Sequence, residues 1–502
     1  MTQSDPRDPR GYAADAPLLA AWLEFQRDVE AGDVAPFSIP GHKHRRDLFG
    51  DIVRGDAPLF AGLDTMKQSR GLLAAAEALA AEAWGVDWCR LSVGGSTHAN
   101  QAAVLALGRP GQPVIVSRTL HRSVLLGIVF AGLRPVWVRP EIDAATGLPG
   151  AVPVAAVRAA LAEHPDACGV LIGDPSYVGT LSDIAGLADA AHAAGVPLVV
   201  DAAWAAYFGF SPLVPAHALD RGADALVTSA HKTLPAWSQG ALLLARTTRD
   251  GGLLDPDRLQ RGFEASHTTS SAGAILASTD ASRAMLQRDG EELVGRLVRL
   301  VAEARRRLSE VEGVTVLEGR PAGHPDGALA VDPAKLVLLI AGTGAHSHTI
   351  EDDLLADGIT LEMADRDVLV PLVTVADDER SLSGLVEALT AAIGRHRGIP
   401  RPVTPSAAWS VESQPALTPR EAFFATHETV DAEAAIGRVC AELIAPYPPG
   451  VPVLAPGEVV TAGALDALRE TRRDGGRIAY AADPTLDTIQ VVAGVPSTTS
   501  DA

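Results

Sequence analysis

Two short polar stretches contain the residues whose types and spacing suit a chemical reaction. They are Asp201-Ala202-Ala203-Trp204 and Ser229-Ala230-His231-Lys232. Each follows an apolar run rich in Val and Leu, over 197–200 and 225–227, and such a run bounded by polar residues is typical of a buried parallel strand. We therefore expect both stretches at the carboxyl ends of strands, the edge of an open α/β sheet at which ligands bind.

Asp201 and Lys232 form the pair that a pyridoxal phosphate enzyme requires. A lysine amine forms a Schiff base with the cofactor aldehyde, and a carboxylate keeps the pyridine nitrogen protonated so that the ring accepts electrons. The pair alone has low specificity, because many α/β proteins carry Asp and Lys at strand ends only for solubility. The neighbouring motifs must therefore support the interpretation.

A glycine- and hydroxyl-rich stretch follows a predicted strand over 90–93. Gly94-Gly95-Ser96-Thr97 opens a helix that runs to about residue 107. Glycines allow close approach of the backbone, and the N–H groups at a helix start attract an anion. The stretch is thus a candidate phosphate site, and the alternative is an ordinary helix cap.

His121 and the segment 267–271 are two further candidates. His121 follows a strand over 113–116 and precedes a helix, so its ring could lie flat on an aromatic cofactor or be an exposed histidine. The segment from His267 to Ser271 opens a long helix over 272–308. Its hydroxyls either cap that helix or reach a phosphate on another subunit.

Composition and charge limit the partners of the chain. It has 502 residues, of which 47% are hydrophobic and 21% charged, the balance of a soluble globular protein with more than one domain. The formal net charge is −20 and the chain contains no block of basic residues. We therefore expect no nucleic-acid partner, because duplex binding relies on basic side chains, and a cationic substrate is mildly favoured.

The cysteines and the hydropathy pattern predict a cytoplasmic protein. Cys89, Cys168 and Cys440 are scattered without C-x-x-C spacing, so neither a disulfide framework nor a cysteine-ligated metal site is expected. The N-terminus lacks the apolar core of a signal peptide. No apolar run approaches the roughly 20 residues that a membrane span requires.

With these motifs assembled, the chain resembles the Orn/Lys/Arg decarboxylases of the aspartate aminotransferase fold, which are fold type I pyridoxal phosphate enzymes. The resemblance extends from Pro40-Gly41-His42-Lys43 to Pro456-Gly457-Glu458. The matching pieces, in addition to these two, are Ser229-Ala230-His231-Lys232, Gly95-Ser96-Thr97, His121 with Ser123, Asp201-x-Ala203-Trp204, Thr269-Ser270-Ser271 and Tyr447-Pro448-Pro449-Gly450-Val451-Pro452. Their common order is far more specific than any one of them.

The resemblance implies an α/β architecture. An N-terminal segment (1–70) would precede a large pyridoxal phosphate-binding domain (71–310) with a mostly parallel seven-stranded sheet. A small α/β domain (311–397), a Pro-rich linker (398–419) and a C-terminal family domain (420–502) would follow. The core motifs begin by residue 40, which resembles the short form without an N-terminal regulatory domain. In the last domain, the pattern predicts a helix over 431–444.

The resemblance also implies residue roles. Lys232 would hold the cofactor covalently, Asp201 would pair with the pyridinium nitrogen, and His121 would stack on the ring opposite Ala203. Lys232 or His121 would return a proton to Cα. The other cofactor contacts would come from Trp204, Gly95, Ser96, Thr97, Ser229 and His231, with Thr269 and Ser270 from a partner subunit. The protein would therefore be a homodimer or a higher homo-oligomer.

The implied reaction is decarboxylation of arginine, lysine or ornithine to the amine and CO2, as in polyamine biosynthesis. A buried distal cation needs a carboxylate partner, and Asp174, Glu362 and Glu458 are unranked candidates. Another pyridoxal phosphate reaction, such as aminotransfer or oxidation, would use the same cofactor residues. A non-catalytic homologue is the second alternative, but it would have no chemical need for both Lys232 and Asp201.

Overall fold

The computed structural model describes residues 8–34, 37–56, 71–319, 330–403, 411–412, 414–447, 451–473 and 476–495. The chain divides into two compact units, each formed by segments distant in sequence. The first unit comprises residues 1–106 and 199–295, and the second comprises 107–198 and 296–502. Across the described ranges, no helix is both long and apolar enough to cross a membrane.

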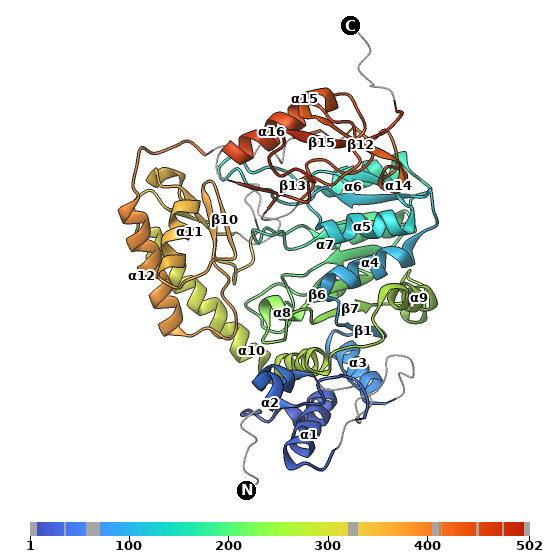
Figure 1. Cartoon of the computed structure of the whole chain (residues 1–502), viewed down its shortest axis with the longest axis vertical. Helices are drawn as coiled ribbons and strands as arrows, with labels where there is room; N and C mark the ends of the chain where they lie inside the picture. Colours follow the sequence, from blue (N-terminus) through green and yellow to red (C-terminus); the bar gives the residue numbers. More distant parts are fainter. Residues whose placement is uncertain are drawn as a thin grey trace. The chain divides into compact units, whose positions relative to one another are not determined.

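The main sheet has seven strands in the order β1-β7-β6-β5-β4-β2-β3 (Figure 1). The pairs β2–β3, β2–β4 and β5–β6 are parallel, whereas β7 runs antiparallel to β1 and β6. The prediction of a mostly parallel seven-stranded sheet is thus confirmed. The strands are β1 (Trp88–Ser92), β2 (Pro113–Ser117), β3 (Arg134–Val138), β4 (Val170–Gly173), β5 (Leu198–Asp201), β6 (Ala225–Ser229) and β7 (Ala241–Ala245).

Two helices of the first unit, those expected to end near residue 107 and to begin near residue 272, lie close to the predicted residues. Gly95 adopts a φ of 70° where the chain turns from β1 into α4, a conformation that favours glycine. The elements are η1 (Tyr12–Ala14), α1 (Pro17–Ala31), α2 (Arg46–Phe49), η2 (Gly50–Gly55), α3 (Leu72–Ala83), α4 (Gly95–Leu107), η3 (Ala218–Arg221), α8 (Ala230–Thr233), η4 (Thr248–Asp250) and α9 (Pro256–Ser266). Helix α10 (Gly273–Ser309) begins in this unit.

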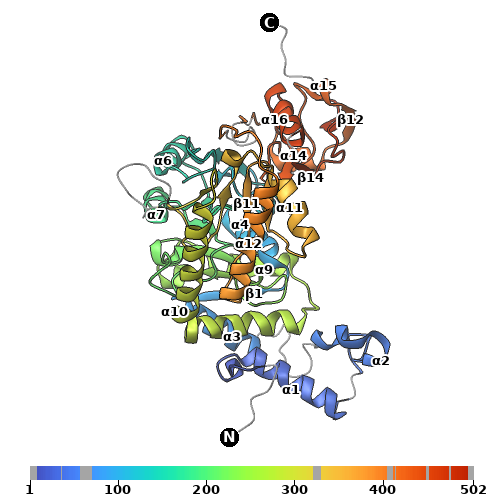
Figure 2. The same ribbon diagram turned by 90° about the vertical axis from the view of Figure 1, so that its left-hand side faces the viewer.

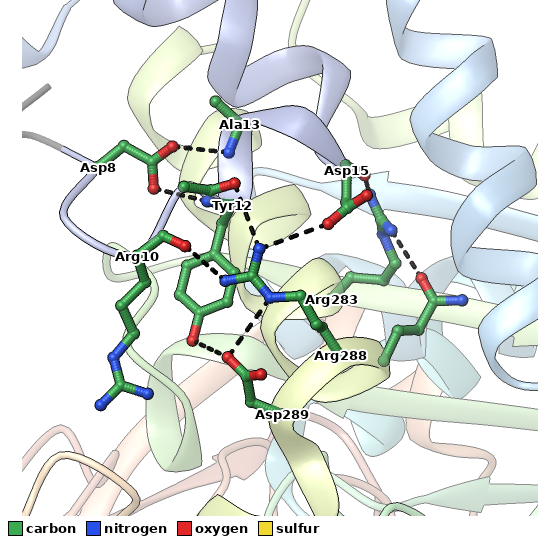
Figure 3. A network of polar contacts seen from close by, with 10 residues as sticks. Asp8, Arg10, Tyr12, Ala13, Asp15, Arg283, Arg288 and Asp289 are labelled. Atoms are coloured by element: carbon green, nitrogen blue, oxygen red, sulfur yellow. Dashed lines mark hydrogen bonds and ion pairs between the residues drawn. The ribbon is translucent and has the colours of Figure 1, made fainter. Parts of the chain in front are cut away.

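Polar contacts tie the N-terminal segment to α10 (Figure 3). The Tyr12 hydroxyl donates to Asp289 at 2.7 Å, and the Arg288 guanidinium lies 4.2 Å from the Tyr12 ring centre. Deeper in the unit, Asp280 accepts a hydrogen bond from the Leu18 amide at 2.9 Å and pairs with Arg283 at 2.5 Å. The first turn of α1 is therefore capped by a buried carboxylate of α10.

The second unit contains a smaller α/β layer after residue 312. Its sheet has the order β10-β11-β9-β8. Helix α11 packs against β10, and it also packs against α12 (Figure 2). The elements are β8 (Thr315–Val316), β9 (Leu338–Leu339), η5 (Ala341–Thr343), α11 (Ser347–Ala356), β10 (Met363–Asp365), β11 (Val368–Val370) and α12 (Glu379–Arg395). Helices α5 (Arg122–Ala131), α6 (Val154–Glu163) and α7 (Ile184–Ala193) follow strands of the main sheet.

Residues 414–447, 451–473 and 476–495 form what we call the C-terminal module. Its elements are α14 (Pro419–Phe424), β12 (His427–Asp431), α15 (Ala432–Ala435), β13 (Ala445–Tyr447), α16 (Ala462–Arg473), β14 (Arg477–Ala479) and β15 (Thr488–Val492). Strand β12 pairs with β15, and β13 pairs with β14. A core of buried aliphatic residues, including Ile444, Val460, Leu465 and Ile489, holds the module together.

The predicted helix over 431–444 is wrong. Helix α15 ends at Ala435, and Gly437 turns the chain with a φ of 82°. Beyond that turn, Val439 and Ile444 make β-bridges to Val459 and Leu454. Here the pairing with residues distant along the chain buries these β-branched side chains, and it outweighs the local preference for a helix.

Candidate active site

Asp201 and Lys232 follow two neighbouring parallel strands. Strand β5 pairs with β6 in a register that places Asp201 opposite Val227, and the Ala202 amide donates to the Val227 carbonyl at 2.8 Å. Lys232 lies on α8, a single helical turn directly after β6. Both residues are therefore at the carboxyl-end edge of these strands, as the sequence predicts.

The carboxylate of Asp201 is buried and held by two donors. Asn100 donates its side-chain amide to Oδ2 at 2.8 Å, and the Ala203 amide donates to Oδ1 at 3.2 Å. Such donors fix the orientation of the carboxylate. Sequence reasoning missed the contact from Asn100. The available signal was its position four residues after Ser96, which places both on one face of a helix.

The amine of Lys232 lies 4.2 Å from the ring centre of Trp204. Trp204 is 8% exposed and belongs to the turn after β5. The turn is joined to β6 because the Thr228 hydroxyl donates to the Ala202 carbonyl at 2.9 Å. A cation over an indole face is an attractive arrangement, and it brings the Lys232 amine to the stretch that begins with Asp201.

The predicted phosphate site, Gly94 to Thr97, forms a cup at the start of α4. Ser96 Oγ lies 2.6 Å from Ser229 Oγ, and both side chains are buried. A Cβ on Gly94 would approach His98 Cβ to 2.8 Å, so a side chain there would displace the helix. Thr97 is exposed. The cup therefore combines two hydroxyls with the positive end of a helix, a donor set that suits a phosphate.

His98 holds the start of this cup in place through hydrogen bonds. Its Nε2 donates to the Phe263 carbonyl at 2.8 Å, so Nδ1 accepts from Ser92 Oγ at 2.8 Å. Ser92 Oγ in turn accepts from the Gly94 amide at 3.1 Å. Burial lowers the pKa of His98 to about 4, against the smaller opposing effect of its bond to Phe263. The ring is therefore neutral at physiological pH.

His231 and the residues before α10 are also in the first unit. His231 Nδ1 donates to the Gly240 carbonyl at 2.9 Å, and burial lowers the pKa of the ring. In its neutral form, Nε2 is an acceptor, so donation to a phosphate would require protonation. Thr269 and Ser270 are exposed immediately before α10.

The remaining predicted residues belong to the second unit. His121 is the N-cap of α5, where Nδ1 accepts from the Ser123 amide at 3.2 Å and lies 2.9 Å from Ser123 Oγ. Because Nδ1 is an acceptor, the proton of the neutral ring is on Nε2. The ring is exposed, and its plane is fixed by these contacts.

The three candidate carboxylates have different surroundings. Asp174 is buried and accepts from the Ser182 amide at 2.6 Å. Glu362 is half-buried and accepts from the Tyr177 hydroxyl at 2.6 Å. Glu458 is 3% exposed, and Arg118 binds both of its carboxylate oxygens. Within the described ranges, no group of three or more His, Cys, Asp or Glu side chains could hold a metal ion.

The fold and the donor set fit one class of cofactor. A lysine amine, a buried aspartate and a hydroxyl-lined helix start, all on one sheet edge, match the aldehyde, ring nitrogen and phosphate of pyridoxal phosphate. The site and the sheet thus define a pyridoxal phosphate enzyme of fold type I. Two family models match the chain, Orn/Lys/Arg decarboxylase major domain over residues 30–381 and C-terminal domain over 404–473. The chain belongs to this family of pyridoxal phosphate-dependent amino-acid decarboxylases.

Relatives and solved structures agree with this assignment. The chain is 32% identical to the arginine decarboxylases of Halalkalibacterium halodurans and Bacillus subtilis, in each case over 91% of this chain and 94% of the relative. The crystal structure of a lysine decarboxylase from Francisella novicida is 18% identical with a TM-score of 0.79. That match covers 95% of this chain and 81% of the solved chain, and it shows the shared fold.

The protonation state of His98 predicts a pH dependence of stability. Its pKa of about 4 in the folded protein is below the ordinary 6.5, so the unfolded chain binds the proton more readily and stability falls as pH drops from 6.5 towards 4. Between pH 7.5 and pH 5, His98 should account for a loss of about 2 kcal/mol. Urea unfolding of the wild type and of His98→Gln at both pH values measures this. A variant with the same pH-dependent loss would show that other groups cause it.

Proposed function

We propose that the protein decarboxylates a basic amino acid, with arginine as the preferred substrate. The observation that carries the proposal is the pairing of β5 with β6, which places Asp201 and Lys232 at one sheet edge beside the cup at the start of α4. The choice of arginine rests on the relatives named arginine decarboxylase, which match over nearly their full length at 29–32% identity. The relatives named lysine decarboxylase are 22% identical.

The residues of the first unit have distinct tasks in this proposal. When bound, pyridoxal phosphate supplies an electron sink for the pair that remains on Cα after the carboxylate leaves. Lys232 would hold the cofactor through its amine, and the substrate amine would take the place of that amine. Asp201, oriented by Asn100, holds a proton at the ring nitrogen. The ring nitrogen would therefore be protonated when the electron pair from Cα reaches it.

The same proposal assigns the remaining contacts. Gly95, Ser96, Thr97 and Ser229 bind the phosphate, with His231 as a donor when it is protonated. Ala203 leaves room for the ring because its side chain is small, and Trp204 lies beside the lysine amine. From the family resemblance, His121 stacks on the ring and, with Lys232, is a candidate to return the proton to Cα.

The function is tested by measuring carbon dioxide and amine release from the cofactor-loaded protein with arginine, lysine, ornithine and other amino acids. We expect equal amounts of both products, with arginine giving the highest kcat/KM. Lys232→Ala should lower turnover on the order of 10³-fold or more and remove the visible absorption of the covalently bound cofactor. An active Lys232→Ala protein would refute the role of Lys232. A keto acid product in the wild type would refute decarboxylation.

Glu362 is the carboxylate that we propose for the distal cation of the substrate. It is half-buried, and one hydrogen bond from Tyr177 orients it. Asp174 instead accepts a hydrogen bond from the Ser182 amide. Both carboxylate oxygens of Glu458 accept hydrogen bonds from Arg118. A guanidinium paired with a partly buried carboxylate contributes substantially to binding, and the loss of one partner is costly.

Glu362→Gln should therefore raise KM for arginine by about tenfold to hundredfold, with a smaller change in kcat. The matched control is Glu387→Gln, which removes an exposed carboxylate from α12 that lies 3.6 Å from Arg307. Steady-state kinetics on both variants give the comparison. If both variants retain the wild-type KM, Glu362 does not bind the distal cation.

The proposal includes a homodimer as the active form. Thr269 and Ser270 expose their hydroxyls just before α10, where they are accessible to a second copy of the chain. We expect the cofactor-loaded protein to sediment as a dimer or a larger oligomer, and Thr269→Ala with Ser270→Ala to weaken cofactor binding. Full activity in a species that sediments as a monomer would contradict this part of the proposal.

A further inference from the structure

Arg118 joins the loop before α5 to the C-terminal module. Its guanidinium donates to Glu458 Oε1 at 2.5 Å, to Glu458 Oε2 at 2.9 Å and to the Val453 carbonyl at 3.0 Å. It also stacks 4.6 Å from the ring centre of Trp137 on β3. Arg118 is 9% exposed, and this two-point ion pair is both geometrically specific and shielded from water. Three residues further along the chain is His121.

Glu458 is presented by a turn that tolerates little change. The Ala455 amide donates to Glu458 Oε2 at 2.9 Å, and the Cys440 amide donates to the Glu458 carbonyl at 2.8 Å. Gly457 has a φ of 93°, and a Cβ there would meet the Leu417 carbonyl at 2.4 Å. These contacts hold the Pro-Gly-Glu turn in one conformation, so the Glu458 carboxylate is presented to Arg118 in a fixed position.

The module contacts helix α5 at both ends. Next to His121, the Arg122 guanidinium lies 4.0 Å from the ring centre of Tyr480. At the other end, Arg420 of α14 donates to the carbonyls of Val129 and Phe130 at 3.0 and 2.8 Å. Helix α14 packs along α5 (Figure 1). A helix held at both ends has little freedom to shift or rotate.

We propose that the C-terminal module positions His121 by clamping α5, and that Arg118 and Glu458 are the positioning residues of this clamp. The inference rests on the proposed contact of His121 with the cofactor. His121 is the N-cap of α5, so any shift of the loop 118–121 moves its ring directly. A buried ion pair has one favourable geometry, and loss of one charge leaves the other uncompensated. The module thereby determines where the ring lies.

The test uses Glu458→Gln, which keeps the size of the side chain and removes its charge. Glu442→Gln is the matched control, because Glu442 is also buried in the module and its carboxylate accepts from amides of the module itself, those of Ala482 and Gln490. Hydrogen exchange of the cofactor-free proteins, followed by mass spectrometry, should show faster exchange over 118–124 in Glu458→Gln alone. Equal exchange over these residues in both variants would overturn the clamp.

Cofactor binding provides the second measurement. Titration of pyridoxal phosphate into each cofactor-free protein should give a Kd raised about tenfold for Glu458→Gln and unchanged for Glu442→Gln. The visible circular dichroism of the bound cofactor, recorded at saturation, should weaken in Glu458→Gln because the ring contact is displaced. In a His121→Ala background, Glu458→Gln should have little further effect on Kd, because the residues act through His121.

These outcomes separate the two proposals. If His121→Ala binds the cofactor with wild-type affinity, the proposed role of His121 is refuted and the positioning inference fails with it. If His121→Ala binds weakly but Glu458→Gln binds normally, only the positioning inference is overturned. A tenfold effect of Glu458→Gln that persists in the His121→Ala background would equally overturn it, since the ion pair would then act independently of His121.

Discussion

The parallel pairing of β5 with β6 is the constraint on which the site depends. Because side chains beyond the ends of parallel strands emerge at one edge, this register carries Asp201 and the stretch Ser229 to Lys232 to the same place. A slip of one residue in either strand would turn its side chains to the opposite faces of the sheet and would move Asp201 out of line with the stretch after β6. The apolar runs of β5 and β6, buried throughout, therefore determine the chemistry indirectly through their register.

Buried polar groups in the site are held by specific partners. The Asp201 carboxylate accepts hydrogen bonds from the Asn100 side chain and from a backbone amide. His98 forms hydrogen bonds with the Phe263 carbonyl and with Ser92, next to the cup. Unpaired polar groups are costly in such surroundings, so each bond also excludes alternative conformations. Pyridoxal phosphate bound at this site would benefit from such rigidity, because the residues that hold it would keep one orientation.

The C-terminal module combines a modest core with several cationic contacts. Arg118, Arg122 and Arg420 reach across to partners on other elements of the second unit. Arginine suits these contacts because its planar guanidinium binds carboxylates with two bonds and stacks on aromatic rings. Through these contacts, the module can hold α5 in a fixed position.

The sequence by itself determined four strands of the main sheet, the helices that begin near residues 95 and 272, and the pair of Asp201 and Lys232. These follow from local periodicity and from residue types that few chemistries need together. It misplaced the helix over 431–444, where β-bridges from Val439 and Ile444 prevail over local preference. Helical spacing from Ser96 was the one indication that Asn100 belongs to the site, but it did not identify Asp201 as the partner. Nothing local indicated that Glu458 would meet Arg118, 340 residues away. Only the tertiary structure decided these partners, because a hydrogen bond or ion pair depends on distances in space, which spacing along the chain does not specify.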